Sequence, residues 1–163
     1  MPVSKNQIYK YLKAVKDPEV PVIDVVELGV VRSVETDGET VQIELTPTYT
    51  GCPAMKVMEQ EIVSALKAKG IENIILKTVL FPPWTTDWMT EETKQKLKEY
   101  GIAPPQKVTD TDLNPLNWET KTVDCPFCES GNTKLTSQFG STACKALYYC
   151  SNCQQPFEHF KCL

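Results

Sequence analysis

The pattern of hydrophobic and polar positions predicts a helix at the start of the chain. Apolar residues recur at helical spacing between Ile8 and Val15. Ser4 can cap this helix, because the side chain of Gln7 can return a hydrogen bond to the cap residue. Pro18 cannot continue a helix, so we expect the helix to end before it and an ordered loop to follow.

A small sheet is predicted after that loop. Two runs rich in β-branched residues, 30–36 and 40–46, are joined through Asp37-Gly38, a pair that accepts positive φ and favours a tight hairpin. Apolar periodicity between prolines and glycines then predicts, in order, a helix over 53–69, a strand over 73–80 and a helix over 91–100. The order helix, strand, strand, helix, strand indicates an α+β fold, in which helices cover one face of a three-stranded sheet.

The composition of the chain changes near residue 103. From 103 to 122 the sequence is polar and interrupted by prolines, and the residues from 125 onward hold six of the seven cysteines. The chain is therefore predicted to consist of an α+β domain over 1–102, a linker over 103–122 and a zinc-ribbon β domain over 123–163. The last part has few aliphatic residues, so a bound metal would have to supply much of its folding free energy.

Charge and hydropathy narrow the class of protein. A net charge of -4, a pI near 5.1 and the lack of a basic patch offer no attraction to nucleic-acid phosphates or anionic lipids. No apolar run is long enough to cross a bilayer, and the first 25 residues lack the apolar segment of a signal peptide. We expect a cytoplasmic protein that binds neither nucleic acid nor membrane, and whose cysteines ligate metal in place of forming disulfides.

Four cysteines form two C-x-x-C pairs, which are separated by 21 residues: Cys125, Cys128, Cys150 and Cys153. This spacing is typical of two hairpin turns that present four thiolates tetrahedrally to a structural zinc ion. An iron-sulfur cluster on the same thiolates stays open as an alternative, because cysteine ligation alone does not separate the two.

Two further cysteines and the only histidine lie near these pairs. Cys144 and Cys162 can act as additional ligands or can pack as small apolar groups. His159 has no second histidine near it in the sequence, so we expect it to be a packed or surface residue and not a metal ligand.

Cys52 is the isolated cysteine, and it lies in Thr50-Gly51-Cys52-Pro53, just before the predicted helix over 53–69. Free backbone N–H groups and the positive end of the helix dipole would favour a thiolate there, and such a thiolate can bind iron or attack an electrophile. The alternative is that Cys52 fills a small space beneath the helix start. The only histidine belongs to the other domain and no other catalytic motif is present, so we do not expect an enzyme.

Three carboxylates, those of Asp17, Glu19 and Asp24, precede the predicted hairpin. They would approach Cys52 if their loop and the loop over 47–52 share one end of the sheet. Hard carboxylates beside a soft thiolate would make a transient iron site, and the alternative is a solvated acidic loop.

An aromatic segment follows the third predicted strand and contains Trp84, Trp88 and Met89. Exposed aromatic residues often anchor a partner protein, so this segment is a candidate docking loop. Alternatively, these side chains close over the sheet as local core.

Several motifs resemble known proteins. Asp17-Pro18-Glu19-Val20-Pro21, Leu28-Gly29-Val30 and Thr50-Gly51-Cys52-Pro53 resemble the iron-sulfur-assembly domain of SufT-type proteins. Further segments resemble the PaaD (or PaaJ) family of the phenylacetyl-CoA epoxidase system, and these segments are 82–88, 100–105, 139–147 and 160–162. The resemblance covers nearly the whole chain.

The resemblance implies an accessory protein of aerobic phenylacetate breakdown in bacteria, which helps to build or repair the iron-sulfur or di-iron centres of the epoxidase. Its implied partners are the oxygenase or reductase subunits of that complex, or general iron-sulfur assembly proteins. Cys52 would handle iron or a nascent cluster with Asp17 and Glu19 near it and Thr50 and Gly51 in its loop, and the paired cysteines would bind zinc. A stoichiometric structural or electron-transfer subunit is the alternative function.

Overall fold

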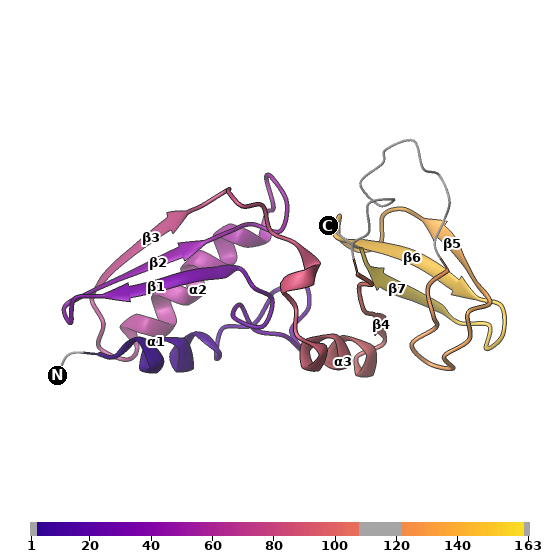
Figure 1. The fold of residues 1–163 in the computed structure, drawn as a ribbon, viewed down its shortest axis with the longest axis horizontal. Coiled ribbons are helices and arrows are strands. Elements are labelled where there is room, and N and C mark those ends of the chain that lie inside the picture. Colours follow the sequence, from indigo (N-terminus) through magenta and orange to yellow (C-terminus); the bar gives the residue numbers. More distant parts are fainter. Residues whose placement is uncertain (1–2, 108–121, 162–163) are drawn as a thin grey trace. The chain divides into compact units, whose positions relative to one another are not determined.

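The computed structural model describes residues 3–107 and 122–161, and the chain divides into two compact units after Trp84 (Figure 1). Each unit is built around its own sheet, of three strands in the N-terminal unit and four strands in the C-terminal unit.

The N-terminal unit has the predicted α+β fold, with both of its helices on one face of the sheet (Figure 1). Its elements, in chain order, are α1 (Lys5–Leu12), β1 (Val31–Thr36), β2 (Thr40–Leu45), α2 (Ala54–Lys67) and β3 (Asn73–Thr78). The central strand is β2, which is antiparallel to β1 and parallel to β3. The prediction of a three-stranded sheet covered on one face is therefore confirmed.

Short-range hydrogen bonds set the ends of these elements. The Ser4 side chain accepts a hydrogen bond from the Gln7 N–H, and the Gln7 side chain accepts one from the Ser4 N–H. In the hairpin turn, Asp37 accepts a hydrogen bond from the Thr40 N–H at 2.7 Å, and Gly38 has a φ of 99°. These bonds join residues that are three positions apart, so they can be predicted from the sequence.

The core of the N-terminal unit consists of aliphatic side chains from the helices and from the covered face of the sheet. Those that are at most 2% exposed include Ile8, Leu12, Val34, Val41, Ile43, Leu45, Met58, Ile62 and Leu66. The opposite face of the sheet carries polar side chains, and Ser33 donates a hydrogen bond to Glu44 across β1 and β2 at 2.8 Å. The alternation of side chains along the strands thus decides which face is covered.

Three loops meet at one end of this sheet. Because β1 and β2 are antiparallel and pair Val31 with Leu45, β1 begins where β2 ends. Thr46, directly after β2, donates its N–H to the Val30 carbonyl and its hydroxyl to the Val79 carbonyl, both at 2.8 Å. The acidic loop before β1, the loop after β2 and the segment after β3 therefore share one end of the sheet.

The C-terminal unit contains a four-stranded sheet together with a helix. Its elements are the 3-10 helix η1 (Thr86–Trp88), α3 (Glu91–Glu99), β4 (Ile102–Ala103), β5 (Thr133–Ser137), β6 (Lys145–Cys150) and β7 (Pro156–Phe160). The strand order is β4-β7-β6-β5, in which β4 runs parallel to β7 and the other pairs are antiparallel. Its hydrophobic cluster is small and comprises Ala103, Val123, Cys125, Ala146, Tyr148, Cys150 and Phe157.

A buried ion pair holds the connection between β5 and β6. The Lys145 side chain is 4% exposed, and its Nζ lies 3.0 Å from a carboxylate oxygen of Glu158. Glu158 also accepts a hydrogen bond from the Ser141 N–H at 2.7 Å. A Cβ added to Gly140 would lie 2.7 Å from the same carboxylate, so a side chain at this position would displace the carboxylate from this arrangement.

The division between the units differs from the predicted domain boundary at residue 102. The structure places α3 and β4 in the C-terminal unit. The physical reason is a long-range strand pairing, in which Ile102 is opposite Glu158 and Ala103 is opposite His159. Ala103 and His159, which are in contact, lie 56 positions apart in the chain. A local sequence pattern therefore cannot predict this pairing.

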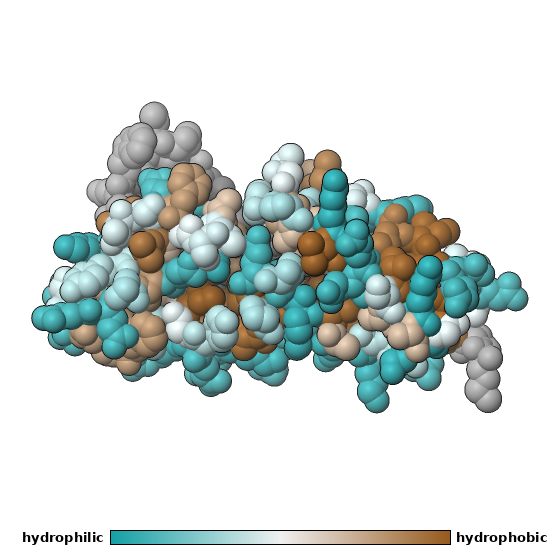
Figure 2. Space-filling model, turned by 180° about the vertical axis from the view of Figure 1, so that it is seen from behind, coloured by the Kyte–Doolittle hydropathy of each residue, from teal (hydrophilic) through white to brown (hydrophobic). Residues whose placement is uncertain are grey.

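The predicted linker over 103–122 is described only in part. Its first residue, Ala103, belongs to β4, and residues 108–121 lie outside the described part of the chain. No helix within residues 3–107 and 122–161 is long and apolar enough to cross a membrane. On the face drawn in Figure 2, hydrophilic side chains surround small hydrophobic patches.

Candidate functional site

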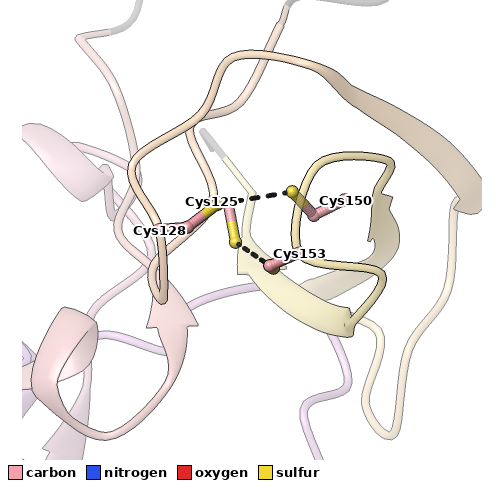
Figure 3. A group of neighbouring side chains, drawn as sticks. All are labelled: Cys125, Cys128, Cys150 and Cys153. Atoms are coloured by element: carbon pink, nitrogen blue, oxygen red, sulfur yellow. Dashed lines mark hydrogen bonds between the residues drawn. The ribbon is translucent and has the colours of Figure 1, made fainter.

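Four cysteine side chains converge in the C-terminal unit (Figure 3). Sγ of Cys125 lies 3.6 Å from Sγ of Cys153, Sγ of Cys128 lies 3.6 Å from Sγ of Cys150, and the four sulfurs are all within 4.8 Å of one another. A tetrahedral zinc ion with Zn–S bonds of about 2.3 Å requires sulfurs about 3.8 Å apart. The donor set therefore fits four-coordinate zinc, and the sulfurs are too far apart for disulfides.

Two turns with the same backbone geometry carry these cysteines, and we name them the first cysteine turn (125–130) and the second cysteine turn (150–155). The N–H of the first cysteine of each turn donates to the carbonyl five residues later, at 3.0 Å in the first turn and 2.9 Å in the second. The residue after each pair has a positive φ, 61° for Glu129 and 60° for Gln154. A side chain in this conformation costs about 1 kcal/mol, which metal binding would offset.

The thiols of Cys128 and Cys153 have opposite surroundings. Hydrogen bonds from the Ser130 N–H and from the Asn152 amide, which is 3.6 Å from the sulfur, lower the pKa of Cys128 to about 6. Burial, together with the neighbouring cysteines, raises the pKa of Cys153 to about 12. One thiolate therefore forms readily, whereas four thiolates together require a cation to offset their burial and mutual repulsion.

Cys52 lies in the turn that leads into α2, at the sheet end where three loops meet. Its N–H donates to the Tyr49 carbonyl at 3.2 Å, and the Thr48 hydroxyl lies 3.9 Å from its sulfur. The first turn of α2 contains no acidic residue, and no side chain caps it, so the positive end of the helix dipole is not opposed there. Cys52 is 8% exposed.

The two aspartates of the acidic loop hold that loop in shape. Asp17 is 5% exposed and accepts hydrogen bonds from the N–H groups of Glu19 and Val20, both at 2.7 Å. Asp24 accepts from the Glu27 N–H at 2.8 Å, and the Glu27 side chain accepts from the Asp24 N–H at 3.1 Å. Burial raises the pKa of Asp24, and the Glu27 carboxylate adds to this. The loop is therefore ordered, as the sequence predicts.

The structure places the Cys52 loop and the acidic loop at one end of the sheet, but it does not gather their side chains into a metal cluster. Within residues 3–107 and 122–161, the paired cysteines are the one group in which three or more Cys, His, Asp or Glu ligand atoms meet. Thr50 and Gly51 lie in the turn before Cys52, and Gly51 has a φ of 78°. A transient iron site formed by Cys52, Asp17 and Glu19 stays a prediction.

The segment predicted to dock a partner is mostly part of the core. Trp84 and Met89 are each 4% exposed, and Trp88 is half-buried. The Trp84 indole N–H donates to the Leu28 carbonyl at 2.9 Å, which satisfies the polar end of the ring inside the unit. The exposed apolar residues are instead the neighbouring Leu80 and Phe81, at 64% and 83%. The local-core alternative therefore fits Trp84 and Met89.

Cys144 lies outside the group of four sulfurs. It is 4% exposed, and its sulfur lies 3.1 Å from the Thr142 hydroxyl. This position favours the packing interpretation over metal ligation. Cys162, the other candidate ligand, lies outside the described residues.

Three residues that contact the sulfurs were not predicted as site residues from the sequence, Ser130 through its backbone N–H and Asn152 and Thr48 through their side chains. Ser130 and Asn152 hydrogen-bond Cys128, and Thr48 lies beside Cys52. Of these three, only Asn152 could have been suspected from the sequence. It lies between the two cysteines of a C-x-x-C pair, so its side-chain amide is necessarily close to the metal site.

His159 is a packed residue, as predicted. It is 7% exposed, its Nδ1 lies 3.1 Å from the Ala103 carbonyl, and its ring packs edge-on against the Tyr148 ring with centroids 5.7 Å apart. Burial lowers the pKa of His159 to about 4. The residue is therefore neutral in the folded protein at pH 7.

Acid should destabilise the C-terminal unit through His159. The unfolded chain binds a proton at a pKa near 6.5 and the folded chain only near 4, so stability falls as the pH drops through this range. From pH 7 to pH 5 the loss attributable to His159 should be about 2 kcal/mol. Urea unfolding of wild type and His159→Gln at both pH values, in excess zinc, checks this. Equal pH dependence of the two proteins would contradict it.

Two family models match the chain, one over each unit: iron-sulfur cluster assembly protein over residues 5–73, and PaaD zinc beta ribbon domain over residues 109–161. A protein of Escherichia coli strain K12, provisionally named as the D component of 1,2-phenylacetyl-CoA epoxidase, is 43% identical over 162 residues, which cover 99% of this chain and 95% of that protein. The chain belongs to the PaaD family. The predicted pairing of an iron-sulfur-assembly domain with a zinc ribbon is thereby confirmed.

Other relatives match the N-terminal unit. The Fe-S protein maturation auxiliary factor YitW of Bacillus subtilis strain 168 is 35% identical over 92 residues, which cover 55% of this chain and 89% of that protein. The solved structure of a domain of unknown function, DUF59, from Bacillus anthracis matches with a TM-score of 0.53 at 30% identity. The match covers 57% of this chain and 90% of that chain. The solved structure of the conserved hypothetical protein TM0487 from Thermotoga maritima matches with a TM-score of 0.51 at 31% identity. The match covers 58% of this chain and 94% of that chain.

Proposed function

We propose that this chain is a maturation factor for the iron-sulfur or di-iron centres of a phenylacetyl-CoA epoxidase complex. The observation that carries the proposal is the full-length likeness to a protein named as a component of that epoxidase. The N-terminal unit is also similar to a protein named as an Fe-S maturation factor. The oxygenase or reductase subunits would be its clients, and iron would be its cargo.

Cys52 is the proposed cargo-handling group. Its thiol lies at the end of the sheet where three loops meet, next to the Thr48 hydroxyl and before an uncapped helix start. A thiolate there can accept iron from a donor and release it to a client, because one thiolate and weak oxygen ligands bind iron less firmly than a closed four-thiolate shell. In this proposal Asp17 and Glu19 support Cys52 indirectly. The hydrogen bond from the Glu19 N–H to Asp17 shapes the acidic loop at the same end of the sheet.

The four paired cysteines are the proposed zinc site, and their role is structural. A zinc ion bound there would cross-link the two cysteine turns, and four thiolates would leave no open position for a substrate. His159 is the only histidine of the chain, and it is packed within the C-terminal unit. We therefore infer that the chain performs no catalytic turnover of its own.

Complementation of a deletion strain with Cys52→Ser tests the proposal. The variant should fold, because serine is close in size to cysteine, yet it should leave the purified oxygenase and reductase depleted of iron and sulfide. Cys144→Ser is the matched control, since it removes another buried cysteine that lies outside the paired cysteines, and it should restore both. Wild-type iron content and epoxidase activity with Cys52→Ser would exclude the thiol from the function.

The second candidate function is a stoichiometric subunit of the epoxidase complex, which the name of the Escherichia coli relative favours. In that case the chain should co-purify with the oxygenase at a fixed ratio through several columns. The oxygenase from the deletion strain would then hold its full iron content and lack only activity. Iron analysis of that oxygenase therefore separates the two functions.

A further inference from the structure

Helix α3 lies in a stretch that neither family model assigns, since residues 74–108 fall between the two matched ranges. Its sequence is mostly polar, and it buries only Thr93 and Leu97. Nevertheless, three separate contacts attach α3 and β4 to the part of the C-terminal unit that carries the paired cysteines.

The first contact is an ion pair between α3 and the first cysteine turn. Lys98 Nζ, in the last turn of α3, contacts the Glu129 carboxylate. Glu129 directly follows Cys128 and has a φ of 61°. Its position therefore depends on the conformation that the turn adopts around the sulfurs.

The second contact is the packing of an aromatic ring on a glycine. Gly101, just after α3, has a φ of 91°, and a Cβ added there would lie 3.2 Å from Cε1 of Phe127. Phe127 is one of the two residues inside the first C-x-x-C pair. The chain leaving α3 and the metal-binding turn are therefore in direct contact.

The third contact is the pairing of β4 with β7, which brings Ala103 into the same hydrophobic cluster as Cys125 and Cys150. This pairing holds only two residues. The strand pairing and the contacts of Lys98 and Gly101 together attach α3 and β4 to the part of the unit that carries the paired cysteines.

A helix of nine residues such as α3 is marginal on its own in water, because isolated helices shorter than about 12 residues rarely persist. The first cysteine turn also needs a cation to be stable. Its thiolates repel one another, and Glu129 has a positive φ that costs free energy. Both partners of the contact are thus weak when separated.

We propose that metal occupancy of the four-cysteine site controls whether α3 is docked and helical. With the metal bound, the first cysteine turn presents Phe127 and Glu129 to Gly101 and Lys98 and holds α3 in place. Without it, the turn relaxes and α3 frays, while the N-terminal unit keeps its structure.

Hydrogen-deuterium exchange of the full chain tests this coupling. Zinc-loaded protein is compared with protein from which a chelator has removed the zinc under anaerobic, reducing conditions, with metal analysis of both. The amides of 94–101 should exchange at least about tenfold faster after zinc removal. Helix α1 is the internal control, because it is similarly short, with eight residues against nine, and lies in the other unit, so its exchange should not change. Unchanged exchange of α3 after complete zinc removal would overturn the proposal.

Variants of the zinc-loaded protein show whether the coupling passes through the first cysteine turn. Phe127→Ala and Glu129→Gln should each speed exchange of α3 by about two- to fivefold while the amides of β6 stay protected. Gln154→Glu is the matched control, since it changes the equivalent residue of the second cysteine turn, and it should leave α3 unaffected. If neither Phe127→Ala nor Glu129→Gln affects α3, or if Gln154→Glu affects it equally, the proposed route is wrong.

Discussion

The Cys150→Ser variant is expected to lose zinc and to unfold its C-terminal unit, while the N-terminal unit stays folded. Cys150 is fully buried, and among the described residues the buried part of the hydrophobic cluster around it has seven members, two of which are cysteines of the metal site. Structural zinc contributes about 10–16 kcal/mol of apparent binding free energy in small domains. Loss of one thiolate should therefore cost more than about 3 kcal/mol. Zinc analysis and urea unfolding measure both effects.

Cys144→Ser provides the comparison for this experiment. It also replaces a buried cysteine of the C-terminal unit, but one outside the group of four sulfurs, so one zinc per chain should remain. Retention of zinc and of wild-type stability by Cys150→Ser would contradict the assignment of the site. Iron and acid-labile sulfide in place of zinc in the wild type would instead support the iron-sulfur alternative.

The Trp84→Ala variant is expected to destabilise the N-terminal unit by about 3–5 kcal/mol, which is the range for removal of a buried aromatic side chain. Trp84 is 4% exposed, and it donates its indole N–H to the Leu28 carbonyl at the sheet end that also carries the acidic loop. Its removal leaves both a cavity and an unpaired buried carbonyl. Thermal unfolding with metal-loaded protein checks the loss, because the C-terminal unit then serves as a stable reference.

Phe81→Ala is the matched control, since Phe81 is also aromatic, lies three residues away and is 83% exposed. Its replacement should change the free energy of unfolding by less than about 0.5 kcal/mol. If Trp84→Ala were as stable as Phe81→Ala and instead weakened binding to the oxygenase, then Trp84 would be a docking residue and not core.

The elements of the N-terminal unit can be predicted from the sequence because their signals are local. Ser4 and Gln7 cap α1 through bonds across three residues, and Asp37 and Gly38 form the turn between β1 and β2. The spacing of the paired cysteines is equally local, since each pair lies within one turn of the backbone. Convergence of two such turns is required by tetrahedral ligation, so the four-sulfur group follows from the sequence as well.

Burial of the tryptophan segment could not be decided in this way. A sequence run with two tryptophans and a methionine fits an exposed docking loop and a covered core equally well. The choice depends on whether the chain folds back so that Trp84 meets the Leu28 carbonyl, 56 residues earlier. That contact depends on the packing of the whole unit.

The sequence by itself determined the α+β order of elements, the ordered acidic loop and the four cysteines of the metal site, because hydrogen bonds and ligand spacings between near neighbours specify them. Only the tertiary structure decided that α3 and β4 belong with the metal site, since a two-residue pairing with β7 and the contacts of Lys98 and Gly101 join distant segments. It also decided that the loops of Cys52 and Asp17 share one end of the sheet, because that follows from the direction in which β1 and β2 pair.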